Sequence, residues 1–505
     1  MGLRQLLPNA LLLACVLFVL QLQWSLYPTI KSGLQHLNSS VHLNETEKTG
    51  SVHREWPSGS RTKRKRYLFK CTDKVRKSRA AQPNCNAILK GDQREICAWE
   101  HVNIPEESPE NLLKNLENCT KFQISNDFAS QPASKTETVF PLAFTILVHK
   151  NADQLIRLLR LIYWPQNVYC IHVDKKSLSV LHAIVKRLTE CIPNVIVTKS
   201  EHVYWGGYGV LRAALNCAQD LRNSDVRWRY MVNIAAQDFP LKTNREIVEI
   251  FRILNGSNDV ELRLEHNFKR YWYNHIPLLD ENNIPIGHVT DSKINKLPVP
   301  HNLHIYKGNF AASLSRTFID FLFTDRRSID FIEWLNGTDV ADEHAWPTLN
   351  HNVQTAEAPG GYPGPCLNAS QPKPWITRYV QWHNEDHKHA RQICHGRVVR
   401  DVCVMGVGDL KNLPARPELF VNKLYTDHQS VAYACLESWF RSRRIYTQRY
   451  PDLAGLTGPR REFYETLDSV KWTRTNGREG CPSGNNGTDG QQVTAFRGYG
   501  SVDTL

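Results

Sequence analysis

Hydrophobic and polar positions form alternating blocks between residues 140 and 176, and these blocks predict a strand, a helix and a second strand. Leu142–Val148 is a short apolar run rich in β-branched and aromatic residues, which is typical of a buried strand. Asn151 is a suitable N-cap, and leucines then recur at helical spacing until Pro165. Val168–Val173 is a second apolar strand. A unit of this kind predicts two parallel strands joined by a right-handed crossover.

The alternation continues along the chain. Helices are expected at residues 179–190 and 208–221, and strands at 195–198, 230–235 and 304–314. Thr243 and Glu246 have the spacing of a capping box, which opens a helix that runs to about Leu254. This order predicts an α/β fold with a mostly parallel sheet flanked by helices on both faces.

Ligands of such sheets bind beyond the carboxyl ends of the strands, and His149 and Asp174 follow the first two strands. Both are candidate binding residues. Alternatively, they are solvated loop residues, which is the commoner fate of a polar residue after a strand.

The flanking segments differ in composition from this part of the chain. Residues 6–27 form an apolar run near the length of a membrane span, with no small-residue cleavage pattern after it. We therefore expect a signal anchor, with residues 1–5 in the cytosol and the rest of the chain luminal. Residues 28–115 are polar and are interpreted as a stem, residues 116–444 as the globular catalytic domain, and residues 445–505 as a poorly ordered tail.

Cysteine usage and glycosylation sequons agree with a luminal location, and the charge bears on the expected partners. The formal charge is +12, but the only tight basic run is at residues 61–66, so no nucleic-acid partner is expected. The thirteen cysteines include no C-x-x-C pair, which favours disulfides over metal sites. Sequons for N-glycosylation occur at Asn38, Asn44, Asn118, Asn255, Asn336, Asn368 and Asn486.

The segment YMVNIAAQDFP at residues 230–240 ends a predicted strand with a carboxylate, Asp238. Sugar-nucleotide transferases often hold a divalent ion with an Asp-x-Asp pair at such a position. No two aspartates of this chain are separated by one residue. If a diphosphate leaves from this site, cationic side chains must stabilise its charge, so no metal is expected.

Five segments together resemble the core 2 and I-branching β-1,6-N-acetylglucosaminyltransferases of glycosyltransferase family 14. They are residues 140–176, QDFP at 237–240, PHNLHIYKGNF at 300–310, ADEHAWPTL at 341–349, and VCVMGVGDL with LFVNK between 402 and 423. The resemblance spans roughly residues 119–440. It implies a GT-A-like fold in a type II Golgi enzyme. It also implies metal-independent transfer of N-acetylglucosamine from UDP-GlcNAc, with inversion, to the 6-hydroxyl of a galactose- or GalNAc-containing glycan.

The resemblance also assigns roles on the donor side. Glu343 corresponds to the family's catalytic base, and a carboxylate in that role takes the acceptor proton during attack. Alternatively, Asp342 and Glu343 are acidic residues in the first turn of the next helix. Arg400 and Lys423 correspond to the cations that hold the diphosphate, although by spacing alone both would be surface cations. His149, Asp174 and Tyr204 correspond to nucleotide-side positions.

Acceptor residues carry over less completely. Glu261 and Lys269 match by spacing, and Trp382 matches the family's sugar-stacking tryptophan or is a core aromatic. Trp272 and Asn384 depart from the core 2 pattern, which puts core 1 O-glycan specificity in doubt. Pro347, inside the segment around Glu343, is unusual for the family.

By analogy the disulfides are Cys71–Cys435, Cys119–Cys191, Cys170–Cys217 and Cys394–Cys403. Cys85, Cys97, Cys366 and Cys481 have no assigned partners. Two alternatives to N-acetylglucosamine transfer are open: a xylosyltransferase of the same family and a non-catalytic glycan-binding relative.

Overall fold

The computed structural model describes residues 82–263, 274–281, 285–289, 292, 294–364, 375–383, 393–450, 456 and 458–475. All of them belong to one compact unit, residues 69–505. The expected anchor at residues 6–27 lies outside these residues. Among the residues that are described, no helix has both the length and the apolar character needed to cross a bilayer.

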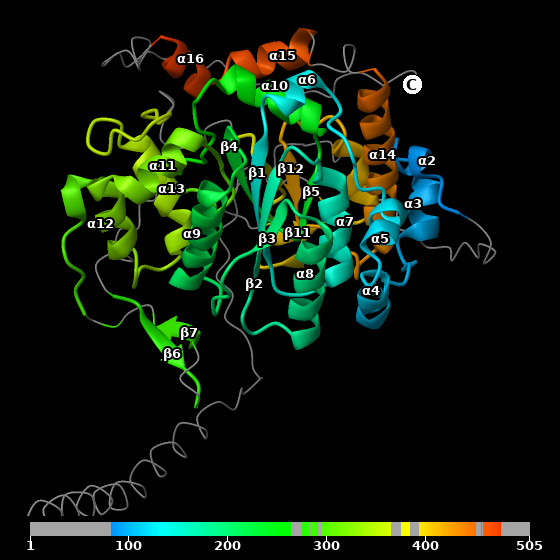
Figure 1. Ribbon diagram of the computed structural model, residues 1–505, viewed down its shortest axis with the longest axis horizontal. Coiled ribbons are helices and arrows are strands. Elements are labelled where there is room, and N and C mark those ends of the chain that lie inside the picture. The colour runs from blue at the N-terminus through cyan, green and yellow to red at the C-terminus, as the bar shows by residue number, and fades with distance from the viewer. Residues whose placement is uncertain are drawn as a thin grey trace, which may run out of the picture. The chain divides into compact units, whose positions relative to one another are not determined.

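A five-stranded sheet with the order β3-β2-β1-β4-β8 forms the centre of this unit (Figure 1). Four of its strands are parallel, which confirms the predicted α/β fold and its mostly parallel sheet: β1 (Leu142–Val148), β2 (Val168–Val173), β3 (Val195–Val197) and β4 (Tyr230–Ala235). The fifth, β8 (Ser313–Ser315), is antiparallel to β4. Every residue of β2 is buried, as expected for a strand covered on both faces.

The strand predicted at 304–314 is wrong for most of its length, because only its end belongs to β8. The backbone N–H groups of His304 and Tyr306 donate instead to two side chains of the helix at residues 345–351 and its C-cap, Asn352 at 2.9 Å and Thr348 at 3.0 Å. These side chains satisfy the backbone of the segment without a neighbouring strand.

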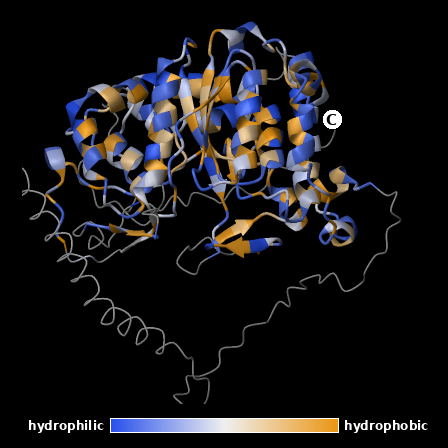
Figure 2. Ribbon diagram, turned by 60° about the horizontal axis from the view of Figure 1, so that its bottom comes forward, coloured by the Kyte–Doolittle hydropathy of each residue, from blue (hydrophilic) through white to orange (hydrophobic). Residues whose placement is uncertain are grey.

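The predicted helices are present and flank the sheet: α7 (Ala152–Ile162), α8 (Ser179–Cys191), α9 (Tyr208–Asn223) and α10 (Asn244–Leu254). Both side-chain bonds of the Thr243 and Glu246 capping box form at the start of α10. Asn151 caps α7 by accepting a hydrogen bond from Gln154 N at 2.9 Å. Figure 2 shows hydrophobic residues concentrated in the central strands and on the helix faces toward them.

Shorter elements complete the unit. A second sheet joins β5 (Asp238–Pro240), β12 (Phe420–Asn422) and β9 (Arg378–Val380). Two hairpins follow, β6 (Ile276–Leu279) with β7 (Pro285–Val289) and β10 (Arg397–Val399) with β11 (Val402–Val404). The remaining helical segments between them are η2 (Pro300–Asn302), α11 (Arg316–Thr324), α12 (Arg326–Trp334), η3 (Ala341–Glu343), α13 (Ala345–His351) and η4 (Val407–Asn412).

Helices before residue 116 pack onto the rest of the unit, which differs from the stem expected to reach residue 115. They are α2 (Cys85–Leu89), α3 (Gln93–Trp99) and α4 (Pro109–Asn115), followed by α5 (Cys119–Ser125) and α6 (Lys135–Thr138). Ile88, Ile96 and Trp99 are buried in one apolar cluster with residues of α14 (Ser430–Arg449). A few apolar contacts therefore attach the segment before residue 116, although its overall composition is polar, to α14.

The expected poorly ordered tail also differs at its start. Two helices, α15 (Gly458–Glu465) and α16 (Asp468–Arg474), follow α14. Tyr464, Leu467 and Val470 are buried in the same apolar cluster as the sheet and α10.

Three disulfides predicted by resemblance are confirmed, namely Cys119–Cys191, Cys170–Cys217 and Cys394–Cys403. The pairing Cys71–Cys435 is wrong, because Cys435 on α14 is bonded to Cys85 on α2. The packing of α2 against α14 places Cys85 beside Cys435. Cys97 is also disulfide-bonded. Cys71, Cys366 and Cys481 lie outside the described residues.

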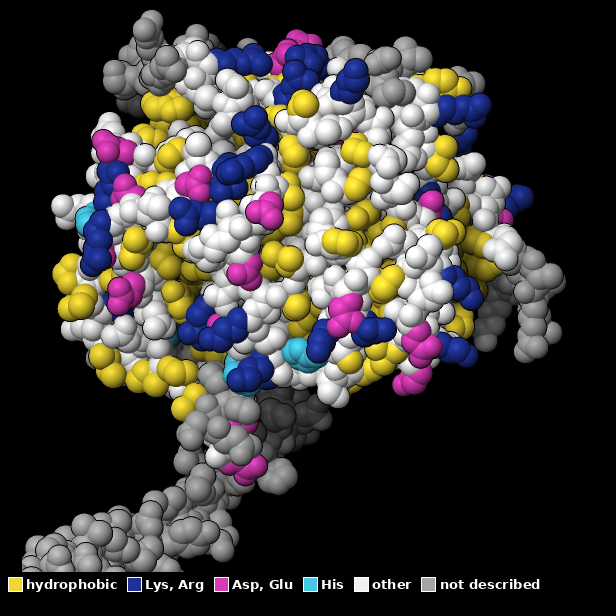
Figure 3. All heavy atoms as spheres, viewed as in Figure 1, with side chains coloured by type: hydrophobic (Ala, Val, Ile, Leu, Met, Phe, Trp, Pro, Cys, Tyr) yellow, Lys and Arg dark blue, Asp and Glu magenta, His cyan; other side chains and the backbone are white. Residues whose placement is uncertain are grey.

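Three predicted glycosylation sites, Asn118, Asn255 and Asn336, are exposed. The other four, Asn38, Asn44, Asn368 and Asn486, lie outside the described residues. Figure 3 shows basic and acidic side chains interspersed over one face of the molecule, which agrees with the absence of a long basic run in the sequence.

Candidate active site

Glu343 is the last residue of η3, and its backbone is fixed on both sides. Its N–H donates to Val340 O at 2.8 Å, and its carbonyl accepts from Gly308 N at 2.8 Å. Gly308 has to be glycine, because a Cβ there would lie 2.0 Å from Glu261 O. Pro347 is the third residue of α13, a helix position whose N–H needs no partner within the helix. The unusual proline therefore fits the helix that follows Glu343.

The side chain of Glu343 faces two cations. Its Oε2 lies 3.5 Å from Lys307 Nζ. Burial raises the pKa of the Glu343 carboxyl above its ordinary value, while Lys307 and Arg263 oppose the rise. Burial and the neighbouring Glu343 raise the pKa of Asp342 to about 8. A carboxylate of raised basicity that is partly exposed to solvent is suited to accept a proton.

Arg263 connects Glu343 to two predicted acceptor residues. Its backbone N–H donates to Lys307 O at 2.6 Å, so the two cations lie on adjacent segments. Its guanidinium lies 2.8 Å from Glu261 Oε1 and 5.2 Å from the ring centre of Trp382. The structure thus brings Glu343, Glu261 and Trp382 into one cluster, and Lys269 lies outside the described residues.

Sequence reasoning missed Lys307 and Arg263. Lys307 lies inside one of the recognised segments and Arg263 two residues after Glu261, but a single cation in either place carries no chemical signal.

The predicted diphosphate cations lie on two adjacent turns. Arg400 is in the β10–β11 turn, with φ +51°, and its guanidinium is 5.9 Å from the Trp205 ring centre. Lys423 follows β12 directly, and its carbonyl accepts from Met405 N at 2.8 Å. Burial and the charge of Arg400 lower the pKa of Lys423 from its ordinary value. The two cations are therefore close enough to repel each other, a pair suited to an anionic ligand.

Strand pairing joins these cations to the acceptor side. Trp382 forms an antiparallel bridge with Val402, two residues after Arg400. Within the second sheet, Val380 pairs with Asn422, next to Lys423. Trp382 is thus located beside both cation-bearing turns while its ring lies under Arg263. Glu343, Arg400 and Lys423 border one region of the fold.

The nucleotide-side candidates lie at the carboxyl ends of β1 and β2. Asp174 N donates to Val148 O at 2.9 Å, and the Asp174 carboxylate accepts from Lys176 N at 3.0 Å. Burial and Lys150 lower the pKa of His149, and the charge of Arg400 also acts on it. His149 is therefore neutral near pH 7 and lies near Arg400.

Tyr204 lies in a turn that is bonded to the Glu343 segment. A Cβ on Gly207 would fall 2.2 Å from the Tyr204 ring, so the ring packs directly on that glycine. Gly206 O accepts a hydrogen bond from Val340 N at 2.9 Å, three residues before Glu343.

Asp238, the carboxylate of the QDFP segment, is fully buried and structural. It accepts hydrogen bonds from Ala235 N and Asn422 Nδ2, both at 2.7 Å, and lies 3.5 Å from Arg378 Nη1. Within the described residues, the side chains spaced to hold a metal ion are Cys394, Cys403 and Asp409. The two thiols of that group form a disulfide.

Comparisons with known proteins identify the family of this chain. Residues 142–414 match the sequence profile of the Branch family, described as the Core-2/I-Branching enzyme. A human N-acetyllactosaminide β-1,6-N-acetylglucosaminyl-transferase is 37% identical over 344 residues, which cover 66% of this chain and 82% of the relative. A mouse β-1,3-galactosyl-O-glycosyl-glycoprotein β-1,6-N-acetylglucosaminyltransferase 3 is 32% identical over 375 residues, covering 72% and 84%. On this similarity, the chain belongs to the Core-2/I-branching family of glycosyltransferases.

Proposed function

We propose that this protein transfers N-acetylglucosamine from UDP-GlcNAc in β-1,6 linkage, with inversion and without a metal, to a galactose- or GalNAc-containing glycan. The observation that carries the proposal is the position of Glu343 beside Lys307, in the region bordered by Arg400 and Lys423. The names of the relatives support the transferred sugar and the linkage. Core 2 and I-type branching are the two acceptor classes that these names suggest.

In this mechanism Glu343 accepts the proton of the acceptor 6-hydroxyl as its oxygen attacks the anomeric carbon. The new glycosidic bond forms while the bond to UDP breaks, and UDP leaves with the electron pair. A single displacement from the opposite face inverts the configuration. Arg400 and Lys423 stabilise the charge that develops on the diphosphate, because preorganised cations act strongly in a partly buried site.

The acceptor is held on the other side of Glu343. One oxygen of the buried Glu261 carboxylate is bonded to Arg263, and the other, Oε2, has no hydrogen-bond partner among the residues that the structure describes. That oxygen can accept a hydrogen bond from a sugar hydroxyl. Trp382 offers an aromatic surface to the C–H face of a sugar.

We also propose a GT-A-type fold in a type II Golgi membrane protein, anchored by residues 6–27. The apolar run, the disulfides and the exposed sequons support luminal exposure of the catalytic domain.

The test uses the full chain, purified in detergent, with UDP-GlcNAc and galactose-terminated acceptors in the presence of EDTA. Transfer is expected to continue in EDTA, and Glu343→Gln should lower kcat by roughly 10²–10⁴. Glu333→Gln, on the exposed surface of α12, is the matched control and should keep the parent rate.

Loss of transfer in EDTA would contradict the metal-free mechanism, and a full rate for Glu343→Gln would remove Glu343 as the base. Preference for UDP-xylose would favour the xylosyltransferase alternative. Acceptor binding without turnover of either donor would favour a glycan-binding relative.

A further inference from the structure

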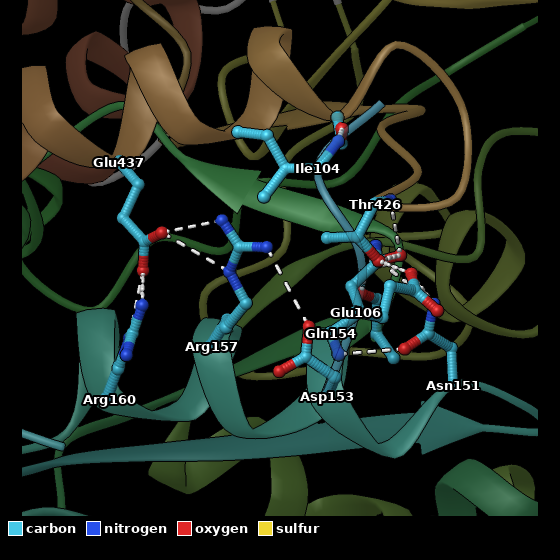
Figure 4. A network of polar contacts seen from close by, with 11 residues as sticks. Ile104, Glu106, Asn151, Asp153, Gln154, Arg157, Arg160, Thr426 and Glu437 are labelled. Atoms are coloured by element: carbon cyan, nitrogen blue, oxygen red, sulfur yellow. Dashed lines mark hydrogen bonds and ion pairs between the residues drawn. The ribbon is translucent and has the colours of Figure 1, made fainter. Parts of the chain in front are cut away.

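A carboxylate from the segment between α3 and α4 joins two loops of the candidate donor site (Figure 4). Glu106 Oε1 accepts a hydrogen bond from Asn151 Nδ2 at 2.6 Å and another from the Thr426 hydroxyl. Asn151 Nδ2 also donates to Thr426 Oγ1 at 2.9 Å. The three side chains therefore form a closed polar triangle, contributed by three segments that are far apart in the sequence.

Each partner of Glu106 follows a predicted donor residue closely. Asn151 is two residues after His149, and Thr426 is three residues after Lys423. Asn151 has φ +62°, a left-handed conformation that asparagine tolerates better than most residues, and its side chain caps α7. Gln154 adds a second connection, because its Nε2 donates to Leu424 O at 2.8 Å and its Oε1 accepts from Thr426 N at 3.2 Å.

The segment that carries Glu106 is itself anchored. Ile104 N donates to the Ser430 hydroxyl, and Ser430 N donates to Asn103 Oδ1 at 3.3 Å. On α7, Arg157 lies 2.7 Å from Glu437 of α14, as Figure 4 also shows. Glu106, Asn151 and His149 line one cavity of about 160 Å³. The polar triangle therefore lies at the edge of the nucleotide side of the candidate site.

We propose that Glu106 is a positioning residue for the donor, because it holds the His149 loop and the Lys423 loop in one arrangement. The inference rests on the proposed function, since it concerns the same UDP-sugar site. Glu106 is exposed, whereas Thr426 in the Lys423 loop is buried, so the bonds of Glu106 contribute less to global stability than to the relative placement of the two loops. A nucleotide that contacts both loops would lose affinity when the loops are no longer joined. Part of its binding free energy would then be needed to order the two loops relative to each other.

The experiment measures UDP binding to the detergent-purified full chain by calorimetry and measures the KM for UDP-GlcNAc and for the acceptor. Glu106→Ala should raise the Kd for UDP and the donor KM about tenfold, with the acceptor KM unchanged. Glu106→Gln keeps an oxygen that can accept both hydrogen bonds and should restore most of the affinity. Glu110→Ala removes an exposed carboxylate four residues away and should change neither value.

The inference is overturned if Glu106→Ala binds UDP as tightly as the parent. It is also overturned if donor and acceptor KM rise together with a fall in Tm, because a structural role alone would give that result. If the unaltered chain does not bind UDP, the proposed function fails, and the inference fails with it.

Discussion

At the residue scale, the basicity of Glu343 depends on side chains that approach it from other segments. Burial raises the pKa of its carboxyl, and Lys307 and Arg263 act in the opposite direction. Because a base works in its deprotonated form, the acid side of the pH–rate profile reports this pKa. The two cations keep Glu343 ionised at a lower pH than burial alone would allow.

Lys307→Met is therefore expected to move the acid limb of the kcat profile to higher pH. Removal of the cation removes an influence that lowers the pKa of Glu343, so that pKa rises and the carboxyl loses its proton only at a higher pH. The profile is measured between pH 5 and 9, with Lys186→Met on the exposed face of α8 as the control. A limb that stays in place would show that Glu343 does not determine it.

Trp382→Ala should raise the acceptor KM about tenfold and leave the donor KM close to the parent value. The variant removes the indole ring that is proposed to pack on an acceptor sugar. The same ring lies 5.2 Å from the Arg263 guanidinium on the proposed acceptor side. The comparison of the two KM values is the measurement. An equal rise in both would point to a core role for Trp382.

At the element scale, hydrophobic periodicity predicted part of the fold and missed other elements, including the 20-residue helix α14. β1, β2 and β4, together with helices α7 to α10, were found in this way. A run of three residues shows little periodicity, and the strands β5, β9 and β12 were not predicted, although β3 of the same length was. These three strands form the sheet that places Lys423 and Trp382 near each other, so the element that assembles the site was not predictable from pattern.

The capping box of α10 allows a direct test at this scale. Thr243→Ala removes one bond of the box and should lower the free energy of unfolding by about 1 kcal/mol. Thermal unfolding measures the change, with Thr324→Ala at the exposed end of α11 as the control. An effect no larger than that of the control would contradict a stabilising box.

At the scale of the whole molecule, the polar composition before residue 116 concealed its packing. Ile88, Ile96 and Leu112 are buried, and Cys85 is bonded to Cys435 across 350 residues of sequence. Composition averages over a segment, whereas attachment depends on a few buried side chains. The incorrect pairing of Cys71 with Cys435 came from the family resemblance, which did not show that the packing of α2 on α14 places Cys85 beside Cys435.

Two truncations test this boundary. A chain that begins at residue 82 keeps α2 to α4 and should unfold near the temperature of the full chain. A chain that begins at residue 116 loses the Cys85–Cys435 disulfide and the buried residues of these helices. Loss of the disulfide alone typically lowers stability by about 2–5 kcal/mol. Thermal unfolding of both proteins is the measurement, and equal midpoints would show that α2 to α4 add nothing to stability.

The sequence by itself determined much of the alternation of strands and helices and the carboxyl-end positions of His149 and Asp174. Through its family resemblance it also named Glu343, Arg400 and Lys423 as candidates for the proposed site. These features are encoded by neighbouring residues or by motifs that can be recognised along the chain. Only the tertiary structure decided that Lys307 and Arg263 flank Glu343, that Glu106 joins two donor loops, and that Cys85 pairs with Cys435. Each of these contacts joins side chains from separate segments, so it exists only after the chain has packed, and no local pattern records it.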